Sequence, residues 1–131
     1  MKFHHRHHIK HDRKSELKEL KESTVEKIHH LSKKIGKPLA KEKKDEYFQD
    51  FFDTVKHFFT KYLGVHHYST YEEIIKELQH KRIDKRIRGR TAKFLQKLVY
   101  VEYANIELST KRTRLLFDEF KYLVDKYVAM E

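Results

Sequence analysis

Residues 47–64, with the sequence YFQDFFDTVKHFFTKYLG, decide the fold of this chain. Bulky apolar side chains recur there at steps of three and four, which places them along one side of an α-helix. Asp50, Asp53, Lys56 and Lys61 take the other side. Gly64 follows the last apolar residue, where a helix commonly ends in a left-handed conformation. Because so many aromatic rings on one face must be covered by other segments, this stretch predicts a compact helical domain.

Three further helices are expected after Gly64, because each has a recognisable start. Thr70 and Glu73 have the spacing of a reciprocal capping box, Asp84 can cap the next helix, and Ser109 or Thr110 can cap the last. Asn105 can stop the helix before it in a left-handed conformation. The expected apolar faces are Tyr71, Ile74, Ile75 and Leu78; then Ile83, Ile87, Phe94, Leu95, Leu98 and Val101; then Leu115, Leu116, Phe117, Phe120, Leu123, Val124, Tyr127 and Val128.

No segment alternates with period two for long, so strands are not expected. The sequence therefore predicts an all-α fold. We expect residues 47–131 to form a small four-helix bundle-like domain, with an additional basic helix or arm before it.

The amino-terminal part is polar and is expected to have two pieces. Residues 1–14 predict a disordered, His-rich basic tail. Residues 15–46 predict a polar amphipathic helix and a linker, with residues 39–46 leading into the aromatic helix. The apolar stripe of this helix is thin: Leu17, Leu20, Ile28, Leu31 and Ile35. Such a stripe predicts a helix that lies on the domain, pairs with another helix or touches a membrane surface, and does not reach deep into a core.

Two groups of side chains have the spacing of metal ligands. His4, His7, His8 and His11 would share a helix face, and His5 lies beside them. Glu46, Asp50, Asp53 and His57 follow one another at steps of four, three and four. No carboxylate pattern orients the tail imidazoles, and the second group needs matching ligands from another helix. We therefore predict a solvated tail and a solvated helix face, with no metal and no cofactor.

Composition narrows the function classes. The net charge is +10, and residues 1–46 and 47–131 are each net basic, which favours anionic partners such as nucleic acid or an acidic membrane surface. The absence of cysteine excludes disulfides and thiolate chemistry and fits a cytoplasmic protein. No apolar run approaches ~20 residues, and the amino terminus lacks the apolar core of a signal peptide. No serine lies in a nucleophile elbow and no Gly-rich phosphate loop exists, so we do not expect an enzyme.

The strongest charge feature is the segment 81–97, whose only acid is Asp84. Five of its cations would form a ladder beside the apolar stripe of a helix: Arg82, Arg86, Arg90, Lys93 and Lys97. Such a ladder can follow the phosphates of a nucleic acid. Tyr100 and Tyr103 could stack on bases, but the favoured expectation is that their rings pack against the domain with the hydroxyl in water. The alternative is a solvated face whose cations meet acids of a neighbouring helix: Asp118, Glu119 and Asp125.

Several helix-end motifs occur in an order that resembles a known helical module. They are Phe58-Phe59-x-x-Tyr62-Leu63-Gly64, then Ser69 to Ile74, Leu98 with Glu102-Tyr103-Ala104, and Glu107-Leu108-Ser109. Over residues 47–128 they are similar to the cytosolic tail domain of archaeal and bacterial membrane proteins of the Bat aerotolerance and transglutaminase-associated types. The resemblance implies a small bundle with a protein-interaction role and no catalytic residue. That module normally follows a membrane span, whereas a basic arm stands there in this chain.

These observations favour a non-enzymatic helical module that binds an unknown protein partner. The alternative is a basic protein that contacts the phosphates of RNA or DNA through the ladder. Peripheral contact with an anionic membrane surface is a further possibility. A partner-binding module should expose an apolar patch, and the candidates for it are Leu17, Leu20, Ile28 and Leu31 or uncovered aromatic residues of the segment 47–64. A nucleic-acid-binding protein should instead expose the ladder as a continuous positive surface.

Overall fold

A computed structural model describes the backbone of residues 2–65 and 69–131, and the side chains of residues 13–65 and 69–131. The described residues form five helices and no strand, so the all-α prediction is confirmed. The helices are α1 (Lys2–Ser32), α2 (Lys41–Leu63), α3 (Tyr71–Gln79), α4 (Lys85–Tyr103) and α5 (Thr110–Ala129).

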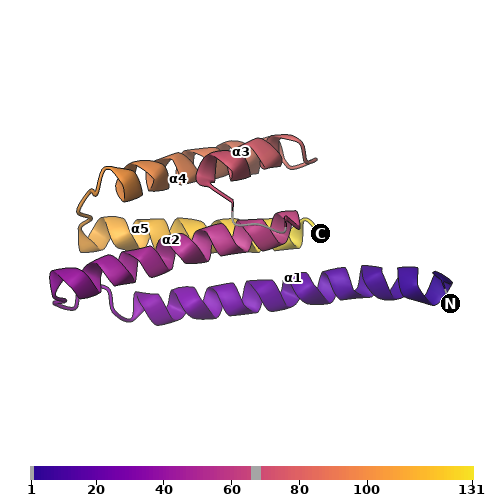
Figure 1. Ribbon diagram of the computed structural model, residues 1–131, viewed down its shortest axis with the longest axis horizontal. Helices are drawn as coiled ribbons and strands as arrows, with labels where there is room; N and C mark the ends of the chain where they lie inside the picture. The colour runs from indigo at the N-terminus through magenta and orange to yellow at the C-terminus, as the bar shows by residue number, and fades with distance from the viewer. Residues whose placement is uncertain (1, 66–68) are drawn as a thin grey trace.

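The helices lie roughly along one direction in three layers, with α1 on one side, α2 and α5 in the middle, and α3 and α4 on the other side (Figure 1). The packing pairs agree with this view: α1 packs on α2 and α5, α3 on α2 and α4, and α4 on α5. The amino-terminal turns of α1 extend past the end of the other helices (Figure 1). This arrangement is the bundle-like packing that the sequence predicts.

The aromatic face of α2 forms the centre of the core, as expected. Its buried residues are Tyr47, Phe51, Phe52, Val55, Phe58, Phe59 and Tyr62, joined unexpectedly by Lys56. Phe120 of α5 lies against this face, with ring centroids 5.9 Å from Phe58 and 6.0 Å from Phe51. Phe94 of α4 stacks on Phe120 at 5.9 Å. The rings of α2 therefore connect the middle layer to α4 through Phe120.

The predicted helix ends from Gly64 onward are confirmed. The Thr70 hydroxyl accepts from the backbone of Glu73, whose carboxylate accepts from the backbone of Thr70, each at 3.2 Å. Asp84 caps α4 and Ser109 caps α5 through side-chain oxygens that accept from backbone N–H groups. Gly64 ends α2 at φ 72°, and Asn105 follows α4 at φ 53°.

The expectation that the first helix stays out of the core was wrong. Leu17, Ile28 and Leu31 are only 2%, 0% and 2% exposed and belong to the main core cluster. The stripe looks thin in sequence because Thr24 occupies its middle, but Thr24 is itself buried. The core therefore extends across the predicted boundary at residue 47.

The amino-terminal end of α1 also differs from the expected disordered tail. The helix begins at Lys2, whereas we expected a boundary at Ser15. Farther along, the Arg13 guanidinium donates to the backbone carbonyl of Tyr62 at 2.9 Å, and Lys21 pairs with Asp125 at 2.7 Å. These contacts tie α1 to the carboxyl ends of both middle helices.

Candidate functional site

The five ladder residues are all exposed. Arg82 precedes α4, and Arg86, Arg90, Lys93 and Lys97 follow along the helix at steps of four, three and four, which keeps them on one face. Asp84 caps this helix by accepting from the backbone N–H groups of Arg86 and Ile87. As the cap, the carboxylate of Asp84 lies at the amino-terminal end of α4.

Arg90 is the ladder residue that an acid of a neighbouring helix neutralises. Its guanidinium donates two hydrogen bonds of 2.7 Å to the carboxylate of Glu119 on α5. It also lies over the ring of Tyr122, 3.8 Å from the centroid. The hydrogen bonds that Arg90 donates to Glu119 raise the pKa of Arg90 above its usual value. Through these contacts Arg90 holds α4 against α5.

The other four ladder residues have no such partner. Arg82, Arg86, Lys93 and Lys97 make no ion pair with any part of the chain that the structure describes. Of the acids named as possible partners, Asp125 pairs with Lys21 instead, and this contact lowers the pKa of Asp125. The ladder thus divides into one structural arginine and four exposed cations.

A groove of about 960 Å³ lies between α4 and α5, and we call it the α4–α5 groove. Its walls carry Lys93 and Lys97 from α4 and Arg112 from α5. Its apolar lining consists of Phe94, Tyr100, Val101, Ile106, Leu108, Leu115 and Leu116. Glu119 is the acid in the lining and is already bonded to Arg90. The groove therefore combines an apolar lining with a net positive rim.

Two large apolar residues of this groove are exposed. Tyr100 is 65% and Leu115 is 59% exposed. Leu115 was predicted to join the buried face of the last helix, and this was wrong, because it lies two positions before Phe117, on the opposite side of the helix from the buried stripe of Phe117, Phe120 and Val124. An offset of two residues, about 200° around the helix, is the sequence signal that could have identified it.

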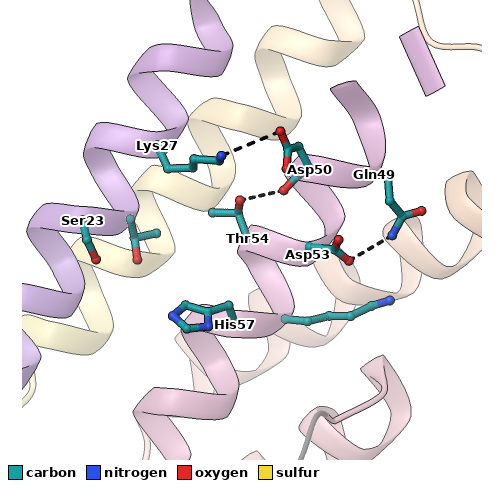
Figure 2. A pocket seen from close by; sticks show the side chains of 9 residues that line it. Ser23, Lys27, Gln49, Asp50, Asp53, Thr54 and His57 are labelled. Atoms are coloured by element: carbon teal, nitrogen blue, oxygen red, sulfur yellow. Dashed lines mark hydrogen bonds and ion pairs between the residues drawn. The ribbon is translucent and has the colours of Figure 1, made fainter. Parts of the chain in front are cut away.

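A second, polar hollow of about 740 Å³ lies between α1 and α2 and includes Asp50, Asp53 and His57 of the predicted group, whereas Glu46 lies outside it and pairs with Lys43. Figure 2 shows Lys27 reaching from α1 to Asp50, at 3.7 Å, while Asp53 accepts from Gln49 at 2.9 Å. His57 points away from Asp53 (Figure 2). The described residues contain no group of three or more His, Asp or Glu placed to hold a metal ion. The contacts at this hollow include the Lys27–Asp50 ion pair and hydrogen bonds from Gln49 to Asp53 and from the Thr54 hydroxyl to the backbone carbonyl of Asp50.

Lys56 was assigned to the polar face of α2, and this was wrong. It is only 6% exposed. Its ammonium lies 3.2 Å from the carboxylate of Glu102 on α4 and 4.5 Å from the ring centroid of Tyr71 on α3. The Tyr71 hydroxyl donates to the same carboxylate at 2.9 Å. This buried network joins three helices, and single-helix periodicity gives no signal for it because the partner acid lies 46 residues away.

Other predicted groups lie outside the described side chains. These are the tail histidines His4, His5, His7, His8 and His11.

Comparisons of the chain with protein-family models, with curated proteins and with solved structures found no match. The resemblance to the Bat-type tail domain therefore stays a prediction. None of the helices in the described ranges has a stretch long and apolar enough to span a bilayer.

Proposed function

We propose that this chain is a non-enzymatic interaction module that binds a protein partner through the α4–α5 groove, in the cytoplasm. The single observation that carries the proposal is the exposure of Leu115 and Tyr100 in a groove lined by further apolar side chains. Burying a side chain of that size stabilises a complex by about 1.5–3 kcal/mol relative to leaving it in water. An exposed apolar patch with a polar rim is typical of protein-interaction sites.

The lining of the groove supports binding more than catalysis. The acid that could move a proton, Glu119, accepts two hydrogen bonds from Arg90 and is fixed by them. The remaining charged groups in the walls are cations with ordinary flexible side chains. Such a set can attract and hold an anionic partner, but it offers no pair of acid and base.

The proposal is tested by placing a photo-crosslinking amino acid at position 115 in the full chain and irradiating it in its native host. The matched control places the same group at Lys121, which is exposed on α5 and does not line the groove. We expect a discrete protein adduct at position 115 that is absent at position 121. Equal labelling at both positions, or no adduct at position 115, would contradict the proposal.

A second candidate function is nucleic-acid binding, and the four unpaired cations favour it. Arg82, Arg86, Lys93 and Lys97 are exposed, and Tyr100 and Tyr103 are exposed at the end of the same helix. If these groups contact phosphates, binding of RNA or DNA should weaken steeply with salt, and alanine at the four positions should flatten that dependence. In the crosslinking experiment, nucleic acid would then replace protein in the adduct.

A further inference from the structure

The charges of the α4–α5 groove define which partners it can accept. Lys93, Lys97 and Arg112 stand at its walls without an ion-pair partner among the described residues, whereas Glu119 is held by Arg90. A partner that covers the groove displaces water from these three cations. Carboxylates on the partner would compensate that loss, whereas a basic or uncharged partner would not.

The backbone of the partner must also be satisfied when it covers an apolar lining. The described part of the chain contains no strand, so the groove offers no sheet edge to which an extended segment could hydrogen-bond. An extended segment over Leu115 and Val101 would leave some of its N–H and C=O groups without partners. A helix satisfies these groups within itself and is therefore the better occupant.

The spacing of the cations sets the pattern on that helix. Lys93 and Lys97 lie one turn apart on α4, about 6 Å along its axis. Arg112 contributes a third cation from the opposite wall on α5. Between the walls, Leu115 and Tyr100 present apolar surface. A matching helix carries apolar residues at steps of three and four, with carboxylates on both sides of that stripe.

From these features we infer that the partner segment is an acidic amphipathic helix that docks in the α4–α5 groove; this inference rests on the proposed function. A second copy of this chain is a poorer match. Over residues 13–32, the exposed acidic face of its own α1 carries Glu19, Glu22 and Glu26 but no exposed large apolar side chain. That face could meet the cations of the groove but would leave the apolar lining in contact with water.

The test is a titration of the full chain with a fluorescently labelled peptide of about 18 residues, five helical turns. The peptide has Leu at steps of three and four, flanked by Glu, with Ala elsewhere. Binding is followed by fluorescence anisotropy at low and at physiological salt. A scrambled peptide of identical composition and a labelled single-stranded RNA are titrated in the same way, to test the two alternative explanations of binding.

Three variants of the protein are titrated with the same peptide and compared with the wild type. Leu115→Lys replaces an exposed side chain and should leave the fold intact while weakening the peptide complex at least tenfold. Lys93→Glu with Lys97→Glu should weaken it at least tenfold and reverse its salt dependence. The matched control is Lys14→Glu with Lys18→Glu on α1, which makes the same charge change at exposed positions one turn apart and should leave the affinity within twofold.

Each other outcome overturns the inference. Equal binding of the scrambled peptide would mean that the negative charge of the peptide alone determines its affinity. Tighter binding of the RNA, lost in the same charge-reversal variant, would assign the groove to nucleic acid. Concentration-dependent dimerisation abolished by Leu115→Lys would assign it to a second copy. If no peptide binds but position 115 still yields a protein adduct in the host, the proposed function stands and only the acidic helix is wrong.

Discussion

At the scale of single residues, Gly89 is a place where the chain gives up stability without a visible structural reason. It lies inside α4, and a Cβ built on it meets nothing within 4 Å. Its φ is not positive, so neither close packing nor backbone geometry requires glycine.

Gly89→Ala should therefore stabilise the protein by about 0.5–1 kcal/mol, because alanine loses less backbone entropy in a helix. Urea denaturation would show a higher midpoint with an unchanged slope. A lower midpoint would mean that α4 needs a flexible position here.

The buried network around Lys56 predicts a strong context dependence. Removing the ammonium by Lys56→Met leaves Glu102 without its ion-pair partner in a largely buried site, and should cost about 3 kcal/mol. Adding Glu102→Gln removes the uncompensated charge and should recover much of that loss. A double-mutant cycle in urea measures both effects. Additive losses would show that the two groups do not depend on each other.

Tyr47 predicts how stability changes at alkaline pH. Its hydroxyl donates to the carbonyl of Leu31 at 2.6 Å, and burial raises the pKa of Tyr47 to about 12 from an ordinary value of 10.0. The unfolded chain thus loses this proton at a lower pH than the folded protein does. The contribution of the Tyr47 hydroxyl to folding stability is complete below about pH 10 and is lost as the pH rises from about 10 to 12.

Unfolding free energies measured across that window in the wild type and in Tyr47→Phe isolate this group from the lysines. The wild type should lose more stability than Tyr47→Phe between pH 10 and 12. Parallel curves would mean that the hydroxyl titrates alike in both states.

At the scale of helices, α1 is the element whose role the structure changes most. Ile28 is 0% exposed and packs within the core cluster. Ile28→Ala should cost about 2–5 kcal/mol, as expected for a core isoleucine. Thermal or urea unfolding measures the loss, and Val25→Ala, at a partly buried position on the same helix, is the milder comparison. A cost below about 1 kcal/mol for Ile28→Ala would return α1 to the peripheral position that its thin stripe suggested.

The helices themselves could be predicted from sequence because their signals are local. The Thr70–Glu73 capping box, the caps Asp84 and Ser109, and Gly64 all mark ends within a few residues. What could not be predicted depends on contacts between distant segments. Thr24 is buried in the core although it is polar. Lys56 is buried because Glu102 of another helix lies beside it.

The candidate site shows the same division between local and distant information. The exposed face of Arg86, Lys93 and Lys97 follows from helical spacing. The pairing of Arg90 with Glu119 could not be predicted from sequence. The antiparallel packing of α4 on α5 determines which of the three candidate acids lies beside Arg90. The α4–α5 groove itself belongs to neither helix and therefore has no signature in either stretch of sequence.

At the scale of the whole molecule, the three layers separate structure from binding. The face of α1 and α2 is polar, and its Asp50 and Asp53 contact Lys27 and Gln49 (Figure 2). The face of α4 and α5 carries exposed Lys93, Lys97 and Arg112 together with exposed Tyr100 and Leu115. The account therefore assigns partner binding to one face of the bundle and only structural contacts to the other.

The most direct test of this central claim is an amide chemical-shift map of the isotopically labelled protein during titration with the acidic amphipathic peptide. Shifts confined to the groove, at Tyr100, Ile106, Arg112 and Leu115, with the signals of Asp50, Asp53 and His57 unmoved, are the result that the account predicts. Shifts centred on the α1–α2 face, or spread evenly over both faces, would contradict it.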